Sequence, residues 1–306
     1  MTHDLHDTPP GAPRSADADP YFWNRYQPGF RASDAPIGSP EWFAEVERRR
    51  YRLEPAIPEM ARFADWSGRD VLEAGCGIGT DGAQFARAGA RYTGLDLSDT
   101  ALTLARRRFD AEGLEAALLR ASITELPFPD ASFDLVYSNG VIHHERDTER
   151  AVAEFHRVLR PGGHAIVMVY HRDSLNYAVN IMVVRRALVA LLEVPGAVRA
   201  VSRITGESED VLQGHADLLA RHGTRYIRDK QLFLSNNTDG PGNSLSKVYS
   251  ASEARALFAA FATVSTRRRF LNLRAYPGGE RLGATPLAER AGRRWGWHLW
   301  IHAVKG

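Results

Sequence analysis

The stretch VLEAGCGIGTD, residues 71–81, decides the fold that this chain can adopt. It places Gly75, Gly77 and Gly79 directly after a short apolar run. Glycines at a strand-to-helix turn let the backbone approach a ligand closely and set the helix N-terminus beside it. Asp96 ends the next apolar run about 20 residues later, where an acid holds the hydroxyls of a ribose in folds of this kind. The spacing therefore predicts a nucleoside-binding turn between a strand and a helix.

Strand-like and helix-like segments alternate on both sides of this turn. The predicted strands are residues 71–75, 92–97, 116–121, 133–138 and 164–170. The predicted helices between them are residues 81–88, 99–112 and 148–159. Repeated βα units of this size imply an α/β fold, with a parallel, doubly wound sheet that helices cover on both faces.

The remaining segments divide the chain into five predicted parts. These are a disordered leader (1–20), a helical N-terminal cover (21–66), a nucleoside-binding core (67–171), a helical insert or lid (172–250) and a C-terminal part of the core (251–306). In the cover, Ser39 is expected to cap a helix that has Pro40 in its first turn. The C-terminal part is expected to hold a helix at 252–261 and an antiparallel strand pair at 264–273 and 295–304.

The composition restricts the classes of function. The 306 residues are 44% hydrophobic and carry a formal net charge of +2, which is typical of a globular protein. The short arginine runs sit beside acids, whereas nucleic-acid binders gather basic residues into one stripe, so we expect no nucleic-acid partner. A lone cysteine, Cys76, excludes an internal disulfide and a thiolate metal cluster. We expect a cytoplasmic protein without a metal site.

The apolar helical pattern of residues 175–194 leaves several interpretations open. Arg185 and Arg186 interrupt it, which argues against stable insertion into a membrane. The segment could serve as a lid, as the face of a homodimer, or as a surface that rests on a membrane.

The identity of the nucleoside also has two interpretations. Gly77, Gly79 and Gly82 fit the dinucleotide spacing G-x-G-x-x-G, so an NAD-dependent oxidoreductase is one alternative. However, Glu73 and Asp81 flank the turn, and two carboxylates would oppose a bound pyrophosphate. S-adenosylmethionine (SAM) carries a sulfonium and an ammonium and no phosphate, so the charge pattern favours SAM.

Four motifs between Val71 and Tyr170 carry a more specific signal. In order, they are LEAGCGIG, GLDLS, LPFPDASFDLVYSNGVIHH and RVLRPGG. With these motifs the sequence resembles the class I SAM-dependent methyltransferases, in particular the bacterial small-molecule type. The resemblance implies a Rossmann-like sheet of seven strands, SAM as cofactor and methyl transfer to a small-molecule acceptor. A SAM-binding regulatory module without catalysis is a further alternative.

The resemblance also implies which residues bind the cofactor. Those implied are Glu73, Gly75, Gly77 and Gly79 around the methionine part, Asp96 at the ribose hydroxyls, Leu97, Ser122 and Ile123 at the adenine, and Asn139 and Gly140 after the fourth strand. Family members often have an aspartate at the position of Ser122, so this contact is a departure from the pattern.

Methyl transfer from a sulfonium is an in-line displacement, and a base helps when the acceptor carries a proton. The residues that follow the fourth and fifth strands lie where reacting groups gather in doubly wound sheets. His143 is the leading candidate base and His171 the second, although packing would also explain both. We expect the acceptor pocket to involve N-terminal aromatics (Tyr21, Trp23, Tyr26), the insert, and the loop around Asn237 and Asp239. The methylated atom (oxygen, nitrogen, sulfur or carbon) is left open.

Overall fold

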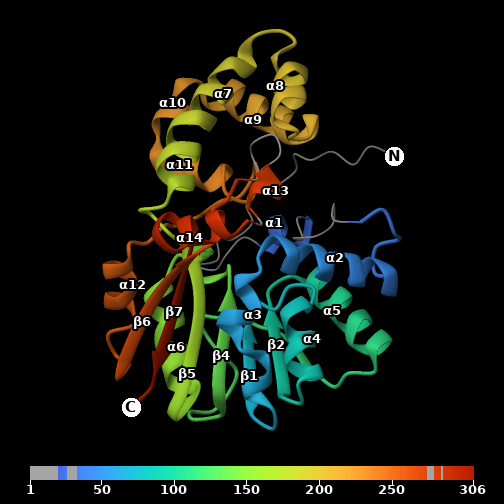
Figure 1. Ribbon diagram of the computed structural model, residues 1–306, viewed down its shortest axis with the longest axis vertical. Helices are drawn as coiled ribbons and strands as arrows, with labels where there is room; N and C mark the ends of the chain where they lie inside the picture. Colours follow the sequence, from blue (N-terminus) through green and yellow to red (C-terminus); the bar gives the residue numbers. More distant parts are fainter. Residues whose placement is uncertain (1–19, 26–32, 274–278, 284) are drawn as a thin grey trace, which may run out of the picture.

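A seven-stranded sheet forms the centre of the molecule (Figure 1). The computed structural model describes residues 20–25, 33–273, 279–283 and 285–306. The strands are β1 (Asp70–Ala74), β2 (Arg91–Asp96), β3 (Ala117–Arg120), β4 (Phe133–Asn139), β5 (Leu159–Tyr170), β6 (Thr263–Arg269) and β7 (His298–Val304). Their order across the sheet is β3-β2-β1-β4-β5-β7-β6, and β7 runs antiparallel to both of its neighbours. The predicted doubly wound sheet with an antiparallel C-terminal pair is confirmed.

The strand order reverses between β1 and β4. The chain goes outward from β1 through β2 to β3, and then returns to pair β4 with the other side of β1. A crevice opens at such a switch point, beyond the carboxyl ends of the strands, and ligands bind there in open α/β sheets. The topology therefore directs attention to the loops that follow β1 and β4.

Helices pack on both faces of the sheet, and local capping sets where they begin and end. The helices of the core are α4 (Thr80–Arg87), α5 (Asp99–Glu112), α6 (Thr148–Val158), α12 (Ala251–Leu257), α13 (Gly279–Gly283) and α14 (Pro286–Trp295). For α5 the predicted bounds are matched, because the Ser98 hydroxyl accepts from the amide of Ala101 at one end and Gly113 takes a left-handed conformation at the other.

Two strand boundaries differ from the prediction by four or more residues, for physical reasons. β5 begins at Leu159 and not at residue 164, because Leu159 pairs with Phe133 of β4 and the Gly162 amide donates to the Lys305 carbonyl at 3.0 Å. β6 ends at Arg269 and not at residue 273, because Phe270 has a φ of 65°, which a β-strand cannot accommodate.

The N-terminal cover consists of short helices, with α2 as the longest. Its elements are α1 (Pro20–Arg25), α2 (Pro40–Leu53), α3 (Ala56–Ala61) and η1 (Phe63–Trp66). The Ser39 hydroxyl accepts from the Trp42 amide at 3.2 Å, which confirms the predicted cap of α2. Buried side chains of α2, Trp42 among them, pack against Ile78 and Leu104 of the core. Apart from Pro20, the predicted leader lies outside the described residues.

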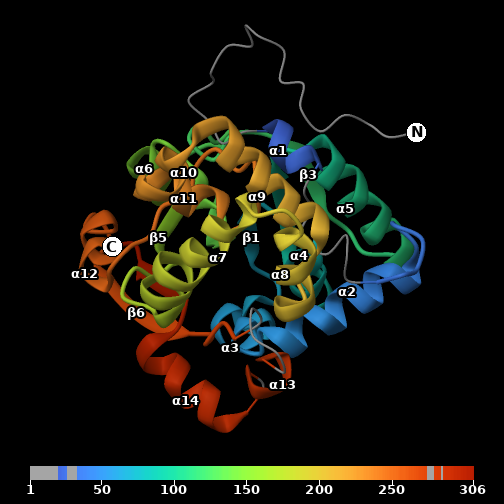
Figure 2. The same cartoon turned by 90° about the horizontal axis from the view of Figure 1, so that it is seen from above.

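A group of short helices, which we call the cap (residues 176–236), stands beyond the edge of the sheet at which β5 ends (Figure 1), and Figure 2 shows it from above. It consists of η3 (Asn176–Arg185, a π-helix), α7 (Arg186–Ala190), η4 (Leu191–Glu193), α8 (Ala197–Thr205), α9 (Glu209–His222), α10 (Thr224–Arg228) and α11 (Lys230–Asn236). Segment 175–194 is thus three successive helix types, with Ile181 buried and Val183 exposed. Of the helices in the described part of the chain, none has the length and apolar character needed to cross a bilayer. The exact domain boundaries stay predictions.

Candidate functional site

A cleft opens at the switch point between β1 and β4. It encloses about 920 Å³, part of it open to solvent, which is within the size range of small-ligand sites. Its walls come from the loop after β1, the ends of β2 and β4, the turn after β4, and the N-terminal cover. The lining residues are Trp23, Arg50, Glu73, Gly75, Cys76, Gly77, Ile78, Thr80, Asp81, Asp96, Leu97, Ala121, Ile123, Asn139, Gly140, Val141, His144 and Glu145.

The glycine turn after β1 forms the floor of the cleft. Gly75, Gly77 and Gly79 have φ values of 81°, 53° and 74°, which are costly for other residues. A Cβ on Gly75 would lie 2.4 Å from a methyl group of Val141, whereas a Cβ on Gly77 would meet no atom within 4 Å. Gly75 is therefore required for packing, and Gly77 leaves open space for a ligand to approach the backbone.

Asp96 is fixed opposite the turn by two backbone amides. Its Oδ2 accepts from the Gly77 amide and its Oδ1 from the Ser98 amide, both at 2.9 Å. Burial raises the pKa of Asp96, and these hydrogen bonds act against that rise. Each carboxylate oxygen keeps a further lone pair, so the geometry suits two hydroxyl donors such as those of a ribose.

Asp81, on the first turn of α4, is the centre of a buried polar cluster. Arg50 binds it in a bidentate manner, with nitrogen–oxygen distances of 3.0 and 2.8 Å. The hydroxyls of Tyr51 and Tyr137 and the amide of Asn139 also donate to its two oxygens. Burial raises the pKa of Asp81, but the charge and hydrogen bonds of Arg50 outweigh this and hold the pKa below its ordinary value.

This cluster changes the charge argument made from the sequence. Asp81 was expected to present a free negative charge to the ligand, but Arg50 neutralises that charge. Arg50, Tyr51 and Tyr137 were not predicted from the sequence as site residues, although Arg50 lines the cleft itself. A charged side chain within a run of arginines carries no local signal that it points inward.

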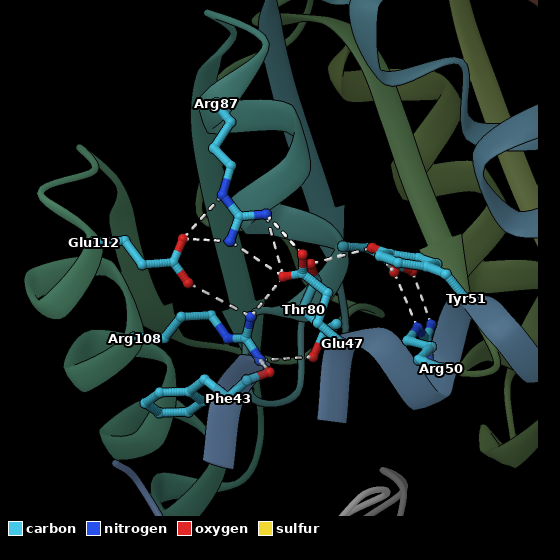
Figure 3. A network of polar contacts seen from close by, with 9 residues as sticks. Phe43, Glu47, Arg50, Tyr51, Thr80, Arg87, Arg108 and Glu112 are labelled. Carbon is cyan, nitrogen blue, oxygen red and sulfur yellow. Dashed lines mark hydrogen bonds and ion pairs between the residues drawn. The ribbon is translucent and has the colours of Figure 1, made fainter. Parts of the chain in front are cut away.

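The ion pairs in Figure 3 hold α2 in the position that places Arg50 at the cleft and the Tyr51 hydroxyl at Asp81. The guanidinium of Arg108 on α5 is fully buried and donates to Glu47 of α2 at 3.0 Å. Arg87 of α4 binds the same Glu47. Helices α2, α4 and α5 are thereby joined around one carboxylate.

Glu73, near the end of β1, is a further acid that lines the cleft. It is buried and accepts a 2.5 Å hydrogen bond from the Tyr92 hydroxyl. Burial raises the pKa of Glu73 well above its ordinary value, and the negative charge of Asp81 raises it further. The ionisation of Glu73 would therefore respond to a cation bound in the cleft.

The structure brings most of the predicted cofactor residues together. Eight of them line the cleft: Glu73, Gly75, Gly77, Asp96, Leu97, Ile123, Asn139 and Gly140. Gly79 instead begins α4 and packs near Phe109, and the Ser122 hydroxyl lies 2.7 Å from that of Thr124. Neither is among the lining residues.

Of the three histidines that follow β4 and β5, His144 lines the cleft, whereas His143 and His171 do not. His144 lines the cleft, with the Trp23 ring edge-on at 4.9 Å. His143 is fully buried between His144 and Tyr170 and is not among the lining residues. His171 is also buried, with Nδ1 3.0 Å from the Gly296 carbonyl oxygen. Burial lowers the pKa of both His143 and His171.

Of the aromatic residues expected around the acceptor, Trp23 lines the cleft. Tyr26 lies outside the described residues, and so does the side chain of Tyr21.

Comparisons with known proteins agree with this geometry. Residues 72–167 match the model of a methyltransferase domain family. The fatty-acid O-methyltransferase of Mycolicibacterium smegmatis is 38% identical over 133 residues, which are 43% of this chain and 47% of that protein. A second protein of the same organism, named "Probable S-adenosylmethionine-dependent methyltransferase", is 35% identical over 182 residues, 53% of this chain and 63% of that protein. The chain thus spans less than two thirds of the length of either relative.

A solved structure extends the likeness of the fold. A chain from the complex between the Haloferax volcanii Trm112 methyltransferase activator and a methyltransferase aligns with 88% of this chain and 96% of its own length. The TM-score is 0.53 at 17% identity, which supports the fold alone. The family match covers the glycine turn, Asp96 and the end of β4, which together build the cleft. Residues 72–167 of this chain are therefore similar to a methyltransferase domain, and the chain is similar to a protein named as an S-adenosylmethionine-dependent methyltransferase.

Proposed function

We propose that this chain transfers a methyl group from SAM to a small-molecule acceptor. One observation carries the proposal: the glycine turn is hydrogen-bonded to Asp96 at a cleft that both line, and a Cβ on Gly77 would meet no atom within 4 Å. Such a backbone surface, with an acid at the end of the next strand, accepts a nucleoside without side chains in its way. At the other end of the cleft the buried Glu73 can ionise to balance a cationic ligand.

Each end of the cleft has its own task. Asp96 accepts from the ribose hydroxyls, and Leu97 and Ile123 cover the adenine. Glu73, Asp81 and Arg50 surround the amino acid part, where Arg50 offers a donor for a carboxylate and Glu73 a counter-charge for an ammonium. When bound, SAM supplies an electrophilic methyl group. The protein excludes water and orients the acceptor, and needs no covalent intermediate.

The donor site is tested by calorimetry with S-adenosylhomocysteine, the demethylated product of SAM. Asp96→Ala should lower its affinity by at least about tenfold, which corresponds to 1.4 kcal/mol. Asp99→Ala is the matched control, because Asp99 begins the next helix with its side chain 66% exposed. Equal affinities in all three proteins would refute the assignment of the ribose site.

The two alternatives predict other results. An NAD-dependent oxidoreductase would show a higher melting temperature with NADH and no rise with SAM. A regulatory module would bind SAM and never transfer its methyl group. The family match favours the methyltransferase over both. We extend the proposal to a cytoplasmic location, which the lone cysteine supports. A homodimer and the absence of a nucleic-acid partner stay predictions, which gel filtration and binding assays can check.

A further inference from the structure

His144 and Asp239 form a buried pair although they come from distant parts of the chain. His144 ends the short turn η2 (Ile142–His144) after β4, and Asp239 lies in the segment that follows the cap. The Nε2 atom of His144 lies 3.4 Å from Oδ2 of Asp239, and the two side chains are 3% and 17% exposed. Because His144 lines the cleft, the segment after the cap brings a carboxylate to the edge of the methyl-transfer site.

Hydrogen bonds fix which nitrogen of His144 can accept a proton. Nδ1 lies 2.8 Å from the carbonyl oxygen of Leu245. A carbonyl only accepts, so Nδ1 must carry the proton and donate it. In the neutral ring, Nε2 then holds the lone pair, and it faces Asp239.

With the ring neutral, the pair therefore presents two acceptors and lacks a donor. Within the described part of the chain, neither Nε2 of His144 nor Oδ2 of Asp239 has a hydrogen-bond partner, although both atoms are buried. The other oxygen of Asp239 accepts from the Tyr170 hydroxyl at 2.8 Å, which holds the carboxylate in place. Buried acceptors without donors are costly, and a ligand that donates a proton would satisfy them.

The surroundings also indicate the charge of that ligand. The carboxylate of Asp239 lies beside His144 and has one oxygen without a hydrogen-bond partner among the described residues. A carboxylate acceptor at His144 would be repelled by Asp239, whereas a neutral hydroxyl would not. This part of the site therefore differs from what a fatty acid requires, although one relative is named for that substrate.

We propose that His144 and Asp239 form the proton-accepting subsite for a neutral acceptor that carries a hydroxyl group; this rests on the proposed function. The acceptor hydroxyl donates to Nε2 of His144. As the oxygen–carbon bond forms and the sulfur–carbon bond breaks, the electron pair of the broken bond stays on sulfur and the hydroxyl proton moves to Nε2. The carboxylate of Asp239 stabilises the resulting imidazolium.

Two measurements test the subsite without turnover. Long-range proton–nitrogen NMR at mildly alkaline pH, with His144 assigned from the spectrum of His144→Gln, should show a proton on Nδ1. Calorimetry on the complex with S-adenosylhomocysteine should show that p-cresol binds at least about tenfold more tightly than p-toluate, which differs only in its anionic group. A proton on Nε2, or no preference for p-cresol, would overturn the proposal.

Turnover of p-cresol with SAM tests the roles of the two side chains. Asp239→Asn and His144→Gly should each lower kcat by at least about 100-fold. Asp173→Asn should not, because Asp173 faces His171 at 3.6 Å and its side chain is 62% exposed. Imidazole in the buffer should restore activity to His144→Gly alone. Unchanged affinity for S-adenosylhomocysteine in all variants shows that the donor site is intact; if the wild type does not bind that compound, the proposed function itself fails.

Discussion

Gly75→Ala should mainly lower the stability of the fold, whereas Gly77→Ala should mainly lower the affinity for the cofactor, although the two glycines are only two residues apart. Both have positive φ, so alanine costs about 1–2 kcal/mol of backbone energy at either position. At Gly77 nothing else is lost from the fold, because the new methyl group meets no atom within 4 Å. It does occupy the cleft, so the affinity for S-adenosylhomocysteine should fall by at least about tenfold.

At Gly75 the new Cβ would lie 2.4 Å from a methyl group of Val141, against about 3.5–4.0 Å for an ordinary carbon contact. Overpacking of this kind costs about 1–3 kcal/mol more. Gly75→Ala should therefore be less stable than Gly77→Ala, with a melting temperature lower by about 2–4 °C for each kcal/mol.

The assays are thermal unfolding of the free proteins and calorimetry with S-adenosylhomocysteine. The double variant Gly75→Ala, Val141→Ala serves as the control, because it removes the methyl group that clashes. It should regain part of the stability lost in Gly75→Ala, so the two effects should not add. The reasoning is refuted if Gly77→Ala binds the compound as the wild type does, or if Val141→Ala gives no recovery.

Three further predictions concern the charged groups. Asp81→Asn leaves Arg50 without its charged partner and should lower the free energy of unfolding, measured in urea, by about 3 kcal/mol. Folding lowers the pKa of Asp81, so the stability that its carboxylate contributes should be fully present above the unfolded pKa of about 3.9. This stability should be lost as the pH falls through the pKa of Asp81 in the folded protein. Binding of SAM should release protons, seen as a buffer-dependent enthalpy, because a cation favours the ionised form of Glu73; proton uptake would contradict this. Glu47→Gln should destabilise the protein more than Arg108→Met, because only the former leaves a buried charge without its main partner; the reverse order in urea unfolding would exclude this account.

The donor half of the site could be predicted from the sequence because it depends on local backbone geometry. Three glycines after an apolar run force a turn, and an acid at the end of the next strand must lie beside it. The positions of Gly77 and Asp96 follow from these rules, and the structure joins them by a hydrogen bond. The contribution of α2 could not be predicted in this way. Arg50 is 31 residues from Asp81, and only the helix phase turns it inward while Arg48 stays 69% exposed.

The histidines show why local sequence patterns do not predict the acceptor side of the site. His143 and His144 are adjacent, and the sequence favoured the first as the base. The short turn η2 instead directs His144 to the cleft and buries His143 against Tyr170. A shift of one residue in this tight turn would instead direct His143 to the cleft and bury His144. A turn of three residues is too short to show a hydrophobic period, so the sequence does not indicate which histidine faces the cleft.

The acceptor half depends on contacts that the chain makes only after folding. The residue that fixes the tautomer of His144, Leu245, is 101 positions away, and Asp239 comes from the same distant segment. Between them lies the cap, which has no counterpart in the family match at residues 72–167. Closing such a long loop costs only slightly more entropy than closing a short one, so inserts of this length are tolerated. An insert after β5 can therefore change which acceptor is bound while the glycine turn and Asp96 keep the donor site unchanged.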